Sequence, residues 1–134
     1  IDHHDMEDAE MSQTLAIAAG GAIGALLRYW ASTVIYAWLG RGFPYGTLAV
    51  NVLGSLLMGL LYVFLLERMT VGPEVRGVLL IGLLGSFTTF STFSIETLNL
   101  IEQADYLKAV LNMLISVLAC VAAAWIGLVI GRQL

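Results

Sequence analysis

The sequence predicts an all-α membrane protein with four transmembrane helices, of which the third is broken. The chain has 134 residues, 59% of them hydrophobic and 12% charged, and its mean hydropathy is +0.88. A soluble domain of this size does not need so much apolar surface. A helix that crosses a bilayer takes about 20 mostly apolar residues, which leaves room for four spans in one small bundle. A hydroxyl-rich segment inside the third span predicts the break.

The first ten residues differ from the rest of the chain. They carry five of its ten acidic side chains and account for the net charge of -4. Met11 resembles a natural start, so we expect residues 1–10 to be a disordered acidic tail or a cloning remnant and residues 11–134 to form the transmembrane domain. His3 and His4 could bind a stray metal ion, although a solvated tail is the commoner outcome for so short a tract. The single cysteine, Cys120, lies in an apolar run and excludes a disulfide framework.

The first two spans are predicted from long apolar runs. The first runs from Thr14 to Leu39 and carries Arg28 near its middle, and two glycines and a proline follow it. The second runs from about Gly46 to Leu66, and Asn51 is the only amide in its apolar body. Residues 67–73 form the next predicted loop.

The third span begins near Glu74 and reaches Ser86, where it meets the segment Gly85–Ser94. That segment has six hydroxyls and three phenylalanines in ten residues, which makes a poor lipid-facing helix. Non-helical backbone inside a bilayer is tolerated only where protein or a water-filled path covers it. We expect the helix to resume around Ile95 and to fade near Gln103. The fourth span runs from about Tyr106 to Gly131.

Small residues recur at helical spacing and favour close helix packing. They are Gly20 and Gly24, Ser55 and Gly59, and then Ala119, Ala123, Gly127 and Gly131. Packing inside one protomer is the simplest explanation, but four helices enclose little volume, and we therefore expect a homodimer. With the N-terminus inside, three basic side chains face inward and two outward, which is almost no bias. Such a chain could insert in both orientations, so we predict an antiparallel, dual-topology dimer.

The break itself is the first candidate site. Consecutive threonines form helix poorly, and a break would free carbonyls and amides at mid-membrane, where such groups coordinate ions. A continuous helix whose hydroxyls bond the preceding turn is the alternative. Phe87, Phe90 and Phe93 are spaced by three. A phenylalanine stripe is usually core, but a small anion could rest against the positive ring edges and still leave.

Other polar groups in the spans have two interpretations each. Asn51 could be interhelical glue or could donate to an anion. Arg28 is a charge inside a span, and its partner could be Glu96 or helix-end carbonyls. Asn112, Ser116 and Cys120 lie at four-residue spacing and make a plausible polar track, although serine in such helices often bonds its own backbone.

Two motifs, Gly46–Gly54 (GTLAVNVLG) and Gly85–Ser94 followed by Glu96, resemble the Fluc fluoride channel family, also called CrcB. Gly24–Arg28 fits the same family, and the likeness covers nearly all of Met11–Leu134. The resemblance implies a multi-pass protein of the bacterial inner (plasma) membrane and not an enzyme. It implies a fluoride-selective channel that exports cytoplasmic fluoride passively, with two pores in each antiparallel homodimer.

The same resemblance implies roles for individual residues. The fluoride pore would be lined by Asn51, Phe90, Phe93, Thr89, Ser91 and Ser116. Arg28 would lie near the vestibule. The backbone carbonyls of Gly85 and Thr88 would hold a structural Na+ ion at the centre of the dimer interface. The acidic tail and Phe87, where we expect an aliphatic residue, depart from the family pattern. The implied partners are fluoride, the lipid bilayer and a second copy of the chain, and no nucleic acid.

Three other classes of protein compete with this interpretation. A small dual-topology multidrug or cation exporter would have a similar length, but proton coupling needs an early membrane carboxylate, and Met11–Leu66 has no Asp or Glu. A non-transporting assembly subunit would explain the small residues but not the hydroxyl-rich break. An intramembrane enzyme is the least supported, because the spans carry no histidine or acidic pair.

Overall fold

The computed structural model describes residues 2–68 and 71–134, and within them it is helical without strands. The elements are α1 (His3–Leu39), α2 (Tyr45–Tyr62), the π-helical η1 (Val63–Arg68), α3 (Pro73–Arg76), the π-helical η2 (Gly77–Leu84), α4 (Gly85–Phe87), α5 (Phe90–Glu102) and α6 (Tyr106–Gln133). They form four stretches long and apolar enough to cross a membrane: His3–Leu39, Tyr45–Arg68, Pro73–Glu102 and Tyr106–Gln133. The predicted four-span, all-α fold is therefore confirmed.

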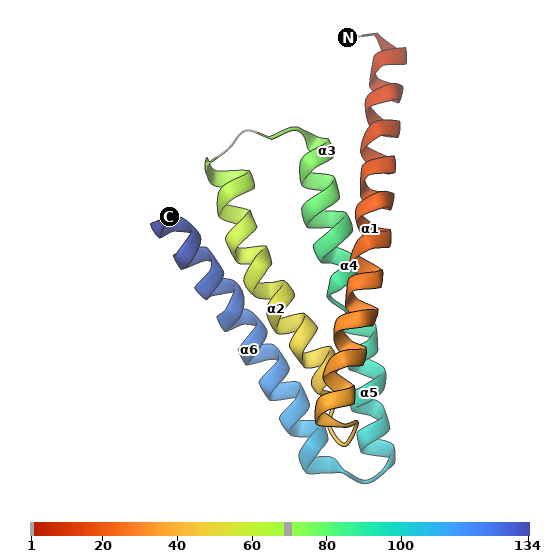
Figure 1. Cartoon of the computed structure of the whole chain (residues 1–134), viewed down its shortest axis with the longest axis vertical. Helices are drawn as coiled ribbons and strands as arrows, with labels where there is room; N and C mark the ends of the chain where they lie inside the picture. The colour runs from red at the N-terminus through yellow and green to blue at the C-terminus, as the bar shows by residue number, and fades with distance from the viewer. Residues whose placement is uncertain (1, 69–70) are drawn as a thin grey trace.

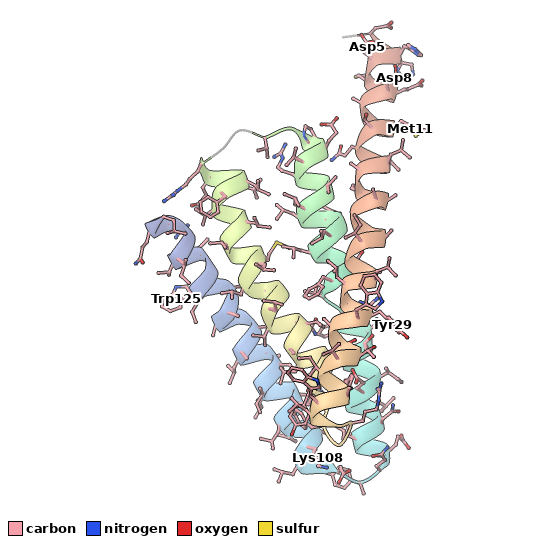
Figure 2. The ribbon with its side chains drawn as sticks, in the orientation of Figure 1. Asp5, Asp8, Met11, Tyr29, Lys108 and Trp125 are labelled. Atoms are coloured by element: carbon pink, nitrogen blue, oxygen red, sulfur yellow. The ribbon has the colours of Figure 1, made fainter. Side chains whose placement is uncertain are left out.

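The four spans alternate in direction and associate as two main pairs. α1 packs against η2, α2 packs against α6, and contacts between α1 and α2 join the pairs (Figure 1). The largest fully buried side chains are Leu84, Val50, Val63 and Asn112. Many large apolar side chains point outward, including Tyr29 and Trp125 (Figure 2). This outward apolar surface is what a protomer in contact with lipid or with a second chain requires.

Glycines let the backbones of paired helices touch. A Cβ atom on Gly59 would lie 2.0 Å from the carbonyl oxygen of Ala124, and one on Gly127 would lie 2.2 Å from that of Leu56. Gly24 is equally close to Leu83 across the other pair. These contacts lie inside one protomer, so packing within the bundle explains these members of the small-residue stripes.

Most helix ends match the sequence expectations. α1 ends at Leu39, and Gly40 adopts a positive φ of 78° that favours glycine. The second span continues through the wider turns of η1 to Arg68, close to the predicted Leu66. Of the loop predicted over residues 67–73, Met69 and Thr70 lie outside the described residues. The fourth span runs two residues beyond the predicted Gly131.

The acidic tail differs from the expectation of disorder, because α1 begins at His3 and continues without interruption into the first span. Its side chains are exposed, and pairs of His3 with Glu7 (3.2 Å) and His4 with Asp8 (3.6 Å) follow the i,i+4 spacing that supports an isolated helix. At about 1.5 Å per residue α1 is roughly 55 Å long, well beyond a hydrocarbon core of about 30 Å. The end with Asp5 and Asp8 projects past the bundle (Figure 2). The domain boundary at residue 11 stays a prediction.

Candidate functional site

The third span is broken at two residues, as the sequence predicted, but the break is shorter than expected. Thr88 (φ −88°, ψ 157°) and Thr89 (φ −152°, ψ 119°) are extended between α4 and α5. The hydroxyl of Thr89 accepts a hydrogen bond from the amide of Thr92 at 3.3 Å, which caps the new helix. α5 therefore restarts at Phe90 rather than near Ile95, and the hydroxyl of Ser94 bonds the carbonyl of Phe90 inside it.

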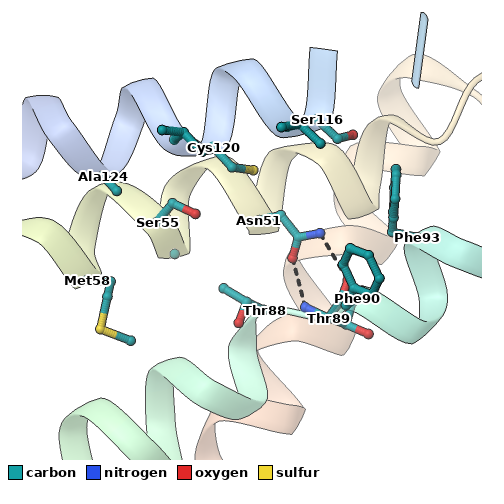
Figure 3. Close-up of a pocket in the computed structure, with 13 residues that line it drawn as sticks. Asn51, Ser55, Met58, Thr88, Thr89, Phe90, Phe93, Ser116, Cys120 and Ala124 are labelled. Atoms are coloured by element: carbon teal, nitrogen blue, oxygen red, sulfur yellow. Dashed lines mark hydrogen bonds between the residues drawn. The ribbon is translucent and has the colours of Figure 1, made fainter. Parts of the chain in front are cut away.

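Asn51 of α2 holds the broken segment from the side. Its Nδ2 donates to the carbonyl of Thr89 at 3.0 Å, and its Oδ1 accepts from the Thr89 amide at 2.8 Å (Figure 3). Both the oxygen and the nitrogen of the Asn51 side-chain amide are thus bonded to the backbone of one residue. Of the two interpretations of Asn51, interhelical bonding is confirmed, and the second N–H of its Nδ2 leaves one donor for an anion.

A cavity of about 410 Å³ lies between α2, the break and α6 (Figure 3). Its lining residues are Asn51, Gly54, Ser55, Met58, Thr88, Thr89, Phe90, Phe93, Ser116, Val117, Cys120, Val121 and Ala124. Five of the six residues predicted for the pore therefore meet at one place. The sixth, Ser91, is exposed and does not line the cavity, although its hydroxyl is 3.5 Å from that of Thr89.

The three phenylalanines of the break have different surroundings. Phe90 and Phe93 both line the cavity, with ring centroids 5.3 Å apart and planes tilted by 46°. Phe90 is 75% exposed, so in a single protomer one side of its ring has no protein neighbour. Phe87 is buried against Gly54 and is not a lining residue, so it serves as core.

The polar track on α6 is a hydrogen-bonded chain. Asn112 is 1% exposed and donates to the hydroxyl of Thr97 at 2.8 Å, while the hydroxyl of Ser116 donates to Asn112 at 3.3 Å. Thr97 in turn donates to the carbonyl of Phe93 at 2.7 Å. Ser116 and Cys120 reach the cavity, whereas Asn112 does not line it and bonds to Ser116 from behind. This arrangement fixes the turn of α5 that carries the Phe93 ring.

Arg28 and Glu96 do not pair with each other. The Nε of Arg28 donates to the carbonyl of Ser86 at 3.0 Å, so its partner is a helix-end carbonyl and not Glu96. Glu96 accepts hydrogen bonds from the hydroxyls of Tyr36, at 2.5 Å, and Thr47, and so joins α1, α2 and α5. Tyr36 and Thr47 were not among the functional residues predicted from the sequence. Thr47 lies within the motif Gly46–Gly54, which was the available signal.

The carbonyls of Gly85 and Thr88 have the chemistry that a hard cation requires. In a continuous helix they would accept from the amides of Thr89 and Thr92. Those amides instead bond Asn51 and the hydroxyl of Thr89. The two carbonyl oxygens are therefore released from the helical ladder, and Gly85 lies on an exposed surface. Neutral oxygens of this kind are ligands for alkali and alkaline-earth cations, so the predicted Na+ fits the residues present.

Comparison with known proteins places the chain among relatives with one shared name. Residues 15–128 match the family described as CrcB-like protein, Camphor Resistance (CrcB). A fluoride-specific ion channel FluC from Magnetococcus marinus is 57% identical over 116 residues, 87% of this chain and 94% of the relative. One from Coxiella burnetii is 53% identical over 121 residues, 90% of this chain and 98% of the relative.

A further relative of that name, from Methylococcus capsulatus, is 56% identical over 119 residues. The match covers 89% of this chain but only 52% of that relative, so the chain spans about half of its length.

Proposed function

The chain belongs to the CrcB-like protein family, and from this membership we propose that it is a fluoride-specific ion channel of the bacterial inner (plasma) membrane. Four stretches long and apolar enough to cross a membrane, together with relatives named as ion channels, support a transport protein and not an enzyme. The observation that carries the proposal is the two-residue break in the third span, which brings Asn51 and the Phe90–Phe93 pair to one cavity. A simple packing subunit would account for the small residues that let the helices approach, but not for a break with Asn51 bonded to it.

Fluoride would be conducted by replacing its water with weak donors. The candidate donors around the cavity are the second N–H of Asn51 and the positive edges of the Phe90 and Phe93 rings. The hydroxyls of Thr89 and Ser116 donate to Thr92 and Asn112 in this structure, and each would have to turn its hydrogen toward the ion to take part. None of them is a full positive charge, so a bound ion can still leave, as conduction requires. Once a partner closes the cavity, a narrow path would exclude larger anions by its width, and flow down the electrochemical gradient needs no energy source.

The pore is completed by a second copy of the chain in an antiparallel homodimer. In support, Phe90 is 75% exposed in the single protomer although it lines the cavity. Val117 (56%) and Val121 (66%) of the cavity wall are exposed as well. A partner that covers this side would close the cavity, and by symmetry each of the two copies would contribute one such pore.

A Na+ ion at the centre of the dimer would be held by the carbonyls of Gly85 and Thr88. The exposed position of Gly85 and the loss of the helical partners of both carbonyls support this assignment. When bound, the ion would offset the partial negative charge of carbonyls that the break has left without amides. Arg28 does the same for the carbonyl of Ser86 through its Nε.

The direct test is ion efflux from liposomes. The purified protein is reconstituted in vesicles loaded with fluoride, and release is followed with a fluoride electrode after a potassium ionophore removes the electrical block. We expect rapid fluoride release and no chloride release under matched conditions. Absence of fluoride efflux, or equal passage of chloride, would contradict the proposed function.

A further inference from the structure

The backbone of Thr89 is paired with a single side chain as if with a neighbouring strand. Thr89 is extended, and in an extended residue the N–H and the C=O point to the same side. The planar amide of Asn51 meets both of them, at 2.8 Å and 3.0 Å. Thr89 is half-buried inside a membrane span. An unpaired backbone N–H or C=O there destabilises the fold by roughly several kcal/mol, so both groups of Thr89 need a partner.

These two bonds decide where the amide hydrogen of Thr89 goes. In an unbroken helix it would bond the carbonyl of Gly85, four residues earlier. Instead, the Oδ1 of Asn51 accepts a hydrogen bond from the Thr89 amide, and the hydroxyl of Thr89 accepts one from the Thr92 amide. If the side chain of residue 51 offered no acceptor, the Gly85 carbonyl would be the nearest competing partner along the chain. Without Asn51 the break would fluctuate between an open form, in which the Thr89 amide has no partner and exchanges, and a helical form, in which the Gly85 carbonyl is occupied.

The same bonds leave Asn51 little capacity for an ion. Its oxygen and one of its two N–H groups are engaged with Thr89, and only the second N–H can reach an anion. By contrast, the Phe90 and Phe93 rings make no polar bond that conduction would have to break. The larger part of the hydrogen-bonding capacity of Asn51 is therefore directed at the backbone rather than at the cavity.

We propose that Asn51 is a positioning residue, which clamps the extended backbone of Thr89, keeps the third span open at the break and thereby keeps the Gly85 carbonyl out of the helical ladder. Its effect on ion flux rests on the proposed channel function, but the clamp itself does not. The clamp makes α2 part of the break, although the two segments are 38 residues apart in the sequence. It also links the pore side of the break to the carbonyl assigned to Na+.

The clamp is tested by amide hydrogen exchange on the full chain in lipid nanodiscs. Peptides that span Thr88–Thr92 are compared in the natural protein, in Asn51→Leu, which is nearly isosteric, and in Asn51→Ser, which is smaller and still polar. Both variants should exchange the Thr89 amide at least about tenfold faster, because a tenfold change corresponds to about 1.4 kcal/mol, the scale of one lost hydrogen bond. The matched control is Phe90→Ile, which removes a lining ring without touching the clamp and should exchange like the natural protein.

Peptides from α6 report whether each variant is folded. If Asn51→Leu exchanges fast everywhere, the smaller Asn51→Ser decides the matter, and fast exchange confined to the break supports the clamp. Natural exchange at the break in both variants, or in the one that folds, overturns the proposal and leaves Asn51 as an ion ligand only.

A second readout separates positioning from direct contact with fluoride. Sodium outside and inside the vesicles is replaced stepwise by a large organic cation while fluoride efflux is measured. Asn51→Ser should need a higher sodium concentration for half-maximal efflux, whereas Phe90→Ile should lower the maximum and keep the sodium dependence. Equal sodium dependence in Asn51→Ser and in the natural protein contradicts the link to the Gly85 carbonyl. A natural protein that passes no fluoride defeats the channel function, and hydrogen exchange still judges the clamp.

Discussion

Gly54 leaves space for the broken segment of the third span, and a larger residue at this position should clash with that segment. Gly54 is buried on α2, one turn beyond Asn51, and it faces the end of α4. A Cβ atom added there would lie 2.3 Å from the Cγ2 of Thr88 and 3.2 Å from a ring carbon of Phe87. The first contact is more than about 1 Å shorter than the ordinary van der Waals separation of about 3.5–4.0 Å. We therefore expect Gly54→Ala to push Thr88 out of its place.

The size of the effect follows from the displacement. Inserting a methyl group into a packed site usually costs about 1–3 kcal/mol. If the break absorbs the strain by moving Thr88 by about 1 Å, groups that must be placed that accurately lose function by roughly 10- to 100-fold. Fluoride efflux from liposomes should therefore fall by about that factor. The protein should remain folded, because the contact involves one methyl group and not a backbone atom.

The assay includes its own rescue. Thr88→Ser removes the Cγ2 atom that Gly54→Ala would strike and keeps the hydroxyl that bonds the carbonyl of Leu84 at 3.1 Å. Efflux in the double variant should return most of the way to that of Thr88→Ser alone. Gly42→Ala is the matched control, since nothing lies within 4 Å of its added Cβ. Additive losses in the double variant, or natural efflux in Gly54→Ala, would refute the steric reasoning.

Three more predictions concern the neighbours of the break. Phe90→Ile and Phe93→Ile should each lower fluoride efflux about two- to tenfold, because one aromatic contact contributes about 0.5–1.5 kcal/mol. Size-exclusion chromatography should show an unchanged assembly. Unchanged efflux in both variants would remove the rings from the pathway. Arg28→Lys keeps the positive charge but loses the Nε bond to Ser86, so efflux should fall; natural efflux would mean that the charge alone matters. Asn112→Leu should lower stability to denaturant by about 1 kcal/mol through lost hydrogen bonds, and a loss above about 3 kcal/mol would show that leucine also overpacks this buried site.

The sequence predicted the spans well because bilayer thickness constrains their length and hydrophobicity. It also located the break, since the glycine and threonines of residues 85–89 are poor helix formers. It overestimated the length of the break because a capping hydroxyl looks like a helix breaker in the sequence. Thr89 is both: it interrupts one helix and starts the next. Only coordinates distinguish the two roles.

Contacts between spans were beyond the reach of sequence reasoning. Arg28 had two possible partners, and the choice of Ser86 over Glu96 depends on the rotation of each helix about its own axis. The pairing of Asn51 with Thr89 depends on the vertical register of α2 against the third span in the same way. No periodicity carries that information. The roles of the lining residues came from the family resemblance, and ion flux has yet to test them.

The open side of the cavity has a consequence for how cells make this protein. In a lone protomer the Phe90 ring is 75% exposed. The polar break lies beside it and would face lipid. Lipid cannot hydrogen-bond to the carbonyls of Gly85 and Thr88, which the break has released from their helical partners, so an unmatched protomer is poorly suited to the membrane. If the partner protomer must have the opposite orientation, unequal insertion in the two orientations would leave unpaired protomers for proteases to remove. Near-equal insertion both ways would then be a requirement of biosynthesis, which selection can maintain by keeping the flanking charges balanced.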